Sequence, residues 1–124
     1  MFTDTRAFSG FSVDDLADAK RFYGETLGLR VSDVAGGLAT LHLAGDRDTL
    51  IYQKSNHTPA TYTMLNFPVD DIEAAVDELT RRGVEFDRPD GIEVDAKGIH
   101  RGEGPLIAWF RDPAGNVLSV LQEG

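Results

Sequence analysis

The sequence predicts an α+β fold in which two β-α-β-β-β modules form one cupped, mixed sheet with helices on its outer face. Three observations predict this fold: a short motif occurs twice, a helical period of apolar residues follows each copy, and each half of the chain ends in a hairpin pattern. The chain has 124 residues, of which 41% are hydrophobic, so it can bury the core of one domain. We expect a single domain over residues 1–124, with module one near residues 4–55 and module two near residues 60–124.

The repeated motif consists of a valine, two aspartates and an aliphatic residue. It occupies residues 13–16 and returns at residues 69–72, so the two copies lie 56 residues apart. Each copy follows a short stretch that predicts the first strand of its module. An internal repeat at this distance indicates two related structural units, neither of which is long enough to bury much surface alone.

A helix is predicted after each copy of the motif, because apolar residues recur there every three or four positions. The aspartate pairs at 14–15 and 70–71 are suited to cap these helices, since an aspartate side chain accepts hydrogen bonds from the free N–H groups of a first turn. Gly28 and Gly83 are suited to end them. We expect the next strands directly at these glycines, over residues 28–31 and 83–86.

Each module is expected to close with a β-hairpin. In module two, the apolar runs at 105–111 and 116–121 flank the turn sequence Asp-Pro-Ala-Gly. In module one, the runs at 39–43 and 49–53 flank a short polar loop. The residues between the two modules, 55–59, read as a linker, and His57 within it is expected to be solvated.

The order of these segments resembles that of the vicinal oxygen chelate superfamily. The resemblance rests on the repeated motif, on Ala19–Leu29, which ends in Thr-Leu-Gly-Leu, and on Phe110–Asn116, which contains the Asp-Pro-Ala-Gly turn. That family includes glyoxalase I, bleomycin-resistance proteins, fosfomycin-resistance enzymes and extradiol dioxygenases. The resemblance covers nearly the whole chain, and it implies both the duplicated fold and the pairing of two chains as a homodimer.

Enzymes of the family that the sequence resembles usually bind one divalent metal in the cup, through His, Glu or Gln side chains on the strands. The resemblance assigns four positions of this chain to those ligands: Phe8, Ile51, Met64 and Ser119. Divalent metals at such sites need carboxylate, amide or imidazole donors, and none of these four side chains supplies one. We therefore expect no metal and no cofactor.

Without a metal, the cup is expected to hold a small-molecule ligand among aromatic and aliphatic side chains with a few polar groups. Alternation along the expected strands groups side chains on shared faces, and the resemblance implies which of these faces point into the cup. Eight residues are then expected there: Phe8, His42, Ile51, Gln53, Met64, Asn66, Trp109 and Ser119. A closed, packed core is the alternative for the bulky side chains. A purely local hydrogen bond is the alternative for His42.

The region from Pro89 to Gly104 is long and interrupted by glycines, as binding loops and lids often are. It contains His100 and Arg101, which we expect at the ligand. The alternative for both side chains is a solvent-exposed loop.

Charge and composition exclude several classes of function. A net charge of −9 disfavours binding to nucleic acid or to an anionic membrane. The chain has no cysteine, which excludes disulfides and thiolate metal sites, and it has no apolar run near the roughly 18 residues of a membrane span. We expect a cytoplasmic protein without a membrane anchor. No strand-to-helix elbow carries a serine or threonine, so we expect no nucleophilic triad.

The function that these observations favour is a metal-free small-molecule-binding protein of the glyoxalase/bleomycin-resistance type, which holds a small apolar or aromatic ligand in the cupped sheet. Two alternatives stay open. One is a glyoxalase-like lyase or isomerase, or a dioxygenase, which would need a metal. The other is a metal-free enzyme that uses His42 or His100 as a general base.

Overall fold

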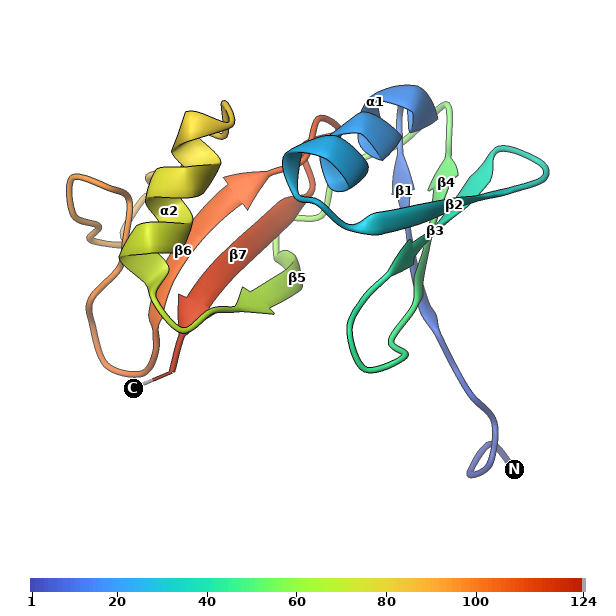
Figure 1. The fold of residues 1–124 in the computed structure, drawn as a ribbon, viewed down its shortest axis with the longest axis horizontal. Coiled ribbons are helices and arrows are strands. Elements are labelled where there is room, and N and C mark those ends of the chain that lie inside the picture. Colours follow the sequence, from blue (N-terminus) through green and yellow to red (C-terminus); the bar gives the residue numbers. More distant parts are fainter. Residues whose placement is uncertain (124) are drawn as a thin grey trace. The chain divides into compact units, whose positions relative to one another are not determined.

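The protein is described by a computed structural model that covers residues 1–123. The chain divides into two compact units, Met1–Thr58 and Pro59–Gly124, which we call unit one and unit two. Each unit contains a mixed sheet and a helix, which confirms the predicted α+β class (Figure 1). Within residues 1–123, no helix combines the length and the apolar character that crossing a membrane requires.

Unit one contains a four-stranded sheet in the order β1-β4-β3-β2. Its strands are β1 (Ser9–Val13), β2 (Arg30–Val34), β3 (Leu38–His42) and β4 (Thr49–Gln53). Strands β1 and β4 run parallel, whereas β3 pairs antiparallel with both β2 and β4. Helix α1 (Leu16–Arg21) forms the crossover after β1 and contacts β3 and β4.

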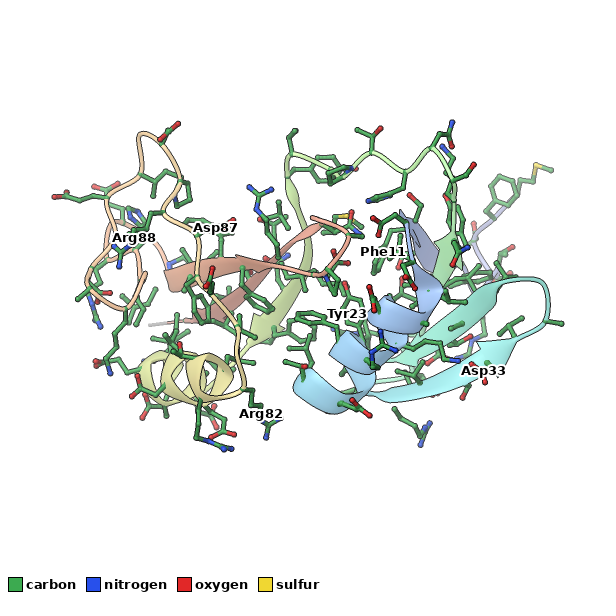
Figure 2. All side chains as sticks on the ribbon, turned by 90° about the horizontal axis from the view of Figure 1, so that it is seen from above. Phe11, Tyr23, Asp33, Arg82, Asp87 and Arg88 are labelled. Carbon is green, nitrogen blue, oxygen red and sulfur yellow. The ribbon has the colours of Figure 1, made fainter. Side chains whose placement is uncertain are left out.

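Helix α1 continues into a π-helical turn at Phe22–Thr26 before the chain reverses at Gly28. In this turn, the N–H of Leu27 donates to the carbonyl of Phe22 at 2.9 Å, five residues earlier. The turn places Tyr23, which is fully buried, against Phe11 of β1, with their ring centroids 6.0 Å apart (Figure 2). This edge-to-face contact is the aromatic part of the core between α1 and its sheet.

Unit two contains a three-stranded sheet in the order β5-β7-β6. Its strands are β5 (Thr63–Pro68), β6 (Leu106–Arg111) and β7 (Val117–Gln122), and helix α2 (Ile72–Arg81) packs on β6 and β7. The strand expected at residues 83–86 is reduced to one bridge, between Phe86 and Phe110. The chain leaves the sheet soon after this bridge, and Pro89 has no N–H with which to continue a ladder.

The core of unit two lies between α2 and one face of its sheet. Phe110 and Leu118 are fully buried there, together with Ile72 and Val76 of the helix. Burying one such side chain contributes roughly 1.5–3 kcal/mol to the free energy of folding, so these few residues hold the helix on the sheet. The opposite face of the sheet is therefore left to carry the candidate site.

The same capping arrangement occurs at the N-terminus of both helices. An aspartate side chain caps each first turn: Asp15 accepts from the N–H of Asp18, and Asp71 accepts from the N–H of Ala74, both at 3.1 Å. A glutamine from the last strand of the unit completes each cap. Gln53 accepts from the N–H of Leu16, and Gln122 accepts from the N–H of Ile72, both at 2.9 Å. Each glutamine therefore ties a helix to its sheet.

The segment from residue 87 to residue 104 is held by a network centred on Asp95. One carboxylate oxygen of Asp95 accepts from the backbone N–H groups of Lys97 and Ile99, each at 2.9 Å, and the other accepts from Nε of Arg101 at 2.9 Å. Lys97 in turn donates to Asp77 of α2 at 2.9 Å. The N–H of Ile99, with the help of the Arg101 guanidinium, lowers the pKa of the Asp95 carboxyl below its usual range.

We expect Gln53→Ala to lower the free energy of unfolding by about 1 kcal/mol, because the N–H of Leu16 loses its acceptor at the helix N-terminus. Gln53→Glu serves as the matched control, since its carboxylate can still accept this hydrogen bond and suits the positive end of the helix. Urea denaturation of the three proteins measures the effect. Equal loss of stability in both variants would contradict this role.

We expect the advantage in unfolding free energy of the wild type over Asp95→Asn to shrink at acidic pH. The folded-state pKa of Asp95 is lowered, so its stabilisation is present above the unfolded-state pKa of about 3.9 and is lost as pH falls through the folded-state value. Denaturation at a series of pH values below about 6 tests this expectation. Asp4→Asn, in the exposed N-terminal segment, controls for the loss of one carboxylate. A difference that does not vary with pH would contradict it.

Candidate ligand-binding site

The face of the unit-two sheet that points away from α2 carries the predicted polar and aromatic residues. Strand pairing places Trp109 beside Ser119, and Ser119 beside Asn66. Their neighbours Phe110 and Leu118 point to the opposite face, where they form the core under α2. The structure thus brings Trp109, Ser119 and Asn66 together, as the alternation of residues predicted.

Two hydrogen bonds organise this face. The hydroxyl of Ser119, which is fully buried, donates to the side-chain oxygen of Asn66 at 2.7 Å. The indole N–H of Trp109 donates to the hydroxyl of Thr63 at 3.2 Å. Both bonds join strands of the same sheet, so they hold the Trp109 indole and the Asn66 amide in place.

Met64 lies at an irregularity of strand β5 rather than in a regular alternation. The pairing with β7 shifts between Thr63 and Leu65, which leaves Met64 as the extra residue of a bulge. As a result, Thr63 contacts Trp109, although strict alternation would give this face to Tyr62, Met64 and Asn66. The sequence carries no clear signal for the bulge, which is why Thr63 was missed.

A cavity of about 450 Å³ opens beside the indole of Trp109. It lies between the end of the sheet and the segment that follows the Phe86 bridge, where Figure 2 labels Asp87 and Arg88. Its lining mixes aromatic, aliphatic and polar side chains: Tyr62, Thr63, Asp87, Ile92, Trp109 and Arg111. The volume falls within the range of small-ligand sites in proteins.

Asp87 and the two arginines at this cavity are already engaged in hydrogen bonds. Nε of Arg111 donates to the Asp87 carboxylate at 2.8 Å, and Arg88 donates to the backbone carbonyls of Asp95 and Ala96 at 3.0 and 2.9 Å. The cavity wall therefore offers hydroxyl groups, an ion pair and aromatic surface, together with the side chain of Asp90. Such a wall suits an aromatic molecule with one or two hydrogen-bonding groups.

His100 lies next to Trp109, whereas Arg101 is directed elsewhere. The imidazole of His100 lies with its ring centroid 6.3 Å from that of Trp109, and its Nδ1 forms a hydrogen bond with the carbonyl of Glu93 at 2.7 Å. Because a carbonyl only accepts, Nδ1 carries the proton. The Arg101 guanidinium pairs with Asp95 and, at 3.6 Å, with Glu73 of α2. Its ion pairs secure the loop to the helix.

In unit one, the structure corrects the expected faces of β4. Ile51 is fully buried and pairs with Phe11 and Ala39 on the face that α1 covers, and Gln53 lies on the same face, where it caps α1. His42 lies on the opposite face, as expected. The prediction of Ile51 and Gln53 toward the cup amounts to a shift of β4 by one residue, which exchanges its two faces.

The glutamine caps show which residues of the two units correspond. Gln53 of β4 matches Gln122 of β7, so Ser119 corresponds to Leu50 and not to Ile51. Leu50 lies opposite Gly10 of β1, as Ser119 lies opposite Asn66 of β5. The position that the resemblance reserves for a metal ligand in the first module is therefore held by a leucine.

Phe8 precedes β1 and is 71% exposed, so it is not part of a packed core. It lines a second cavity, of about 430 Å³, on the open face of the unit-one sheet. The other lining residues include Val34, Thr40 and Leu50, with charged side chains from the loop before β4. Strand register relates this cavity to the one beside Trp109, because Thr40 occupies the position of Trp109.

The residues at the expected ligand positions do not fit a divalent metal. Phe8, Leu50 and Ile51 have no donor atom, Met64 offers only a thioether, and the Ser119 hydroxyl is already bonded to Asn66. Among residues 1–123, no three side chains of the His, Cys, Asp and Glu types are grouped so that they could hold an ion. Chemistry that depends on the family's metal has no donor set at these positions.

Comparison with solved structures identifies several proteins of the same fold. TnmS3, an antibiotic binding protein from Streptomyces sp. CB03234, is 25% identical over 98% of this chain and 99% of that chain, with a TM-score of 0.71. A member of the glyoxalase/bleomycin resistance protein/dioxygenase superfamily from Sphaerobacter thermophilus DSM 20745 is 25% identical over 94% and 97% of the two chains, with a TM-score of 0.67.

A glyoxalase/dioxygenase from Nostoc punctiforme shares the fold at 16% identity, covering 98% of this chain and 93% of that chain, with a TM-score of 0.69. No curated protein matches the sequence. The sequence itself matches the family description over residues 8–120, which is nearly the whole chain. The predicted resemblance is thereby confirmed: the chain belongs to the Glyoxalase/Bleomycin resistance protein/Dioxygenase superfamily.

Proposed function

We propose that the protein is a metal-free binding protein for a small apolar or aromatic molecule, which it holds on the open face of the unit-two sheet. The cavity of about 450 Å³ beside Trp109 carries this proposal, because it combines an aromatic wall with a few fixed hydrogen-bonding groups. TnmS3, a structural relative at 25% identity, is an antibiotic binding protein, which is consistent with a binding role for this fold.

The residues that we assign to ligand binding follow the geometry of the face. Trp109 is the stacking surface, and Asn66, held by Ser119, is a source of hydrogen bonds beside it. Met64 and His100 flank these residues. In unit one, Phe8 lines a cavity of its own, and His42 lies on the same open face.

Three residues of the sequence prediction are left out of the proposed site. Ile51 and Gln53 serve the core and the cap of α1, and Arg101 serves the loop network. The expected homodimer stays a prediction, and so does the cytoplasmic location. A metal-dependent lyase, isomerase or dioxygenase is disfavoured because the expected ligand positions lack suitable donors.

We expect purified protein to carry no stoichiometric Zn, Ni, Fe, Mn or Mg, since the available side chains would leave most of the coordination to water. Elemental analysis after dialysis measures the metal content, and thermal melts at millimolar metal test for binding to the folded state. These ions should leave the melting temperature unchanged, because a ligand stabilises only the state that it binds. About one metal per chain, lost when Ser119 or Asn66 is replaced, would contradict the metal-free assignment.

We expect Trp109→Ala to weaken the binding of small aromatic compounds by more than about 1 kcal/mol, because buried aromatic anchors contribute most of the affinity at such sites. A panel of two-ring aromatic alcohols and amines is screened by calorimetry with the wild type, and hits are repeated with the variant. Trp109 is the only tryptophan, so the quenching of its emission reports independently on the same place.

Phe2→Ala is the matched control for this experiment, since Phe2 is an exposed aromatic residue outside both cavities. Its binding constants should equal those of the wild type. A panel in which no compound binds, or hits that bind equally to Trp109→Ala, would count against the proposed site.

A further inference from the structure

A serine, a histidine and an aspartate form a chain of hydrogen bonds on the open face of the unit-one sheet. The hydroxyl of Ser32 on β2 lies 2.7 Å from Nε2 of His42 on β3. Nδ1 of His42 lies 3.2 Å from a carboxylate oxygen of Asp48, in the loop before β4. The three residues come from three separate segments, so no local sequence motif predicts their contact.

The polarity of this chain follows from the chemistry of its ends. A carboxylate only accepts hydrogen bonds, so Nδ1 of a neutral His42 carries the proton that faces Asp48. Nε2 then has a free lone pair, which accepts the hydroxyl proton of Ser32. This is the arrangement in which a histidine can act as a general base toward a serine, with an aspartate to orient it.

Exposure of the three side chains suits these separate roles. The His42 side chain is only 22% exposed, so the imidazole is held in place by the sheet. Ser32 lies in the exposed part of β2, where its hydroxyl is accessible to a substrate. Asp48 is half exposed, so its carboxylate orients His42 without the desolvation cost of full burial.

The corresponding positions of unit two show what a purely structural link requires. Strand register matches Ser32 to Asp87, His42 to Arg111 and Asp48 to Val117. There, an ion pair of 2.8 Å between Asp87 and Arg111 joins the neighbouring segments. Two residues are therefore enough to connect these segments. In unit one, the hydrogen bond from His42 to Asp48 is additional, and a purely structural connection does not require it.

A place for a substrate adjoins these residues. The cavity of about 430 Å³ in unit one is lined by Asp48 itself and by Val34 and Thr40, which neighbour Ser32 along and across the strands. Its apolar lining comes from Val34, Leu50 and Phe8, whereas Arg47 contributes a guanidinium group. This combination suits a short apolar acyl group next to a carbonyl whose oxygen gains negative charge.

We propose that Ser32, His42 and Asp48 form a hydrolytic site for esters with a short apolar acyl group. The Ser32 oxygen attacks the ester carbonyl as its proton moves to Nε2 of His42, and Arg47 stabilises the oxyanion. The bond to the alcohol then breaks, and His42 returns the proton to the departing oxygen. Water attacks the acyl-serine, gives a proton to His42 and releases the carboxylic acid, after which Ser32 regains its proton.

This activity goes beyond the proposed binding function and uses other residues in another unit. It also differs from the sequence prediction, which looked for a nucleophile only at a strand-to-helix elbow. Ser32 and His42 would touch the substrate as nucleophile and base. Asp48 acts through His42, so it is a positioning residue.

The test uses hydrolysis of p-nitrophenyl butyrate by the full chain, together with labelling by diisopropyl fluorophosphate and mass spectrometry. We expect one covalent adduct, on Ser32, and a loss of hydrolysis of about tenfold or more in Ser32→Ala and His42→Ala. Asp48→Asn should lower kcat and slow the labelling of Ser32 far more than it changes KM, since the carboxylate acts on the reaction through His42.

Ser12→Ala is the matched control, because the Ser12 hydroxyl also forms a hydrogen bond with a histidine, to Nδ1 of His57 at 2.6 Å. It should hydrolyse the ester and take the label on Ser32 as the wild type does. Thermal melts verify that each variant is folded. A wild-type rate no higher than that of folded Ser32→Ala, or a wild-type protein without an adduct on Ser32, would overturn the proposal.

Discussion

The hydrogen bond from a strand glutamine to a helix N-terminus determines how each unit is arranged. Gln53 and Gln122 each lie on the last strand of their unit, and each accepts a hydrogen bond from the first N–H group of the helix. Because side chains alternate along a strand, fixing one glutamine on the helix side fixes every second residue there as well. The remaining residues, among them Trp109 and Ser119 in unit two, are thereby assigned to the open face. The location of both cavities depends on this constraint.

The two units share the capping glutamine and the division of the sheet into a helix-covered face and an open face. They differ in the side chains that the open face carries. Equivalent positions carry Trp109 in one unit and Thr40 in the other, and the Asp87–Arg111 ion pair replaces the Ser32–His42 hydrogen bond. The buried faces also differ, since Leu41 and Thr49 of unit one correspond to Phe110 and Leu118 of unit two. Those changes alter the packing of each core, whereas the changes on the open faces alter the chemistry that a ligand would meet.

The class of the fold, both helices and both hairpins could be predicted from the sequence, because they depend on local periodicity and on a motif that occurs twice. The faces of β4 could not, since Leu50 on the open face is as apolar as Ile51 on the face that packs on α1. The bulge at Met64 was equally hidden, because pairing with β7 determines it. The contact between Asp48 and His42 depends on the conformation of the loop before β4, which the spacing of residues in the sequence does not predict.

The π-helical turn at Phe22–Thr26 has a consequence for chain length. The capping aspartates Asp15 and Asp71 are 56 positions apart, whereas the helix-ending glycines Gly28 and Gly83 are 55 apart, so unit one has one more residue between cap and glycine. A π-turn takes up a single added residue by widening one loop of the helix. The insertion is thus absorbed before β2 begins, and Ser32 keeps the orientation that a slip of one residue would have reversed.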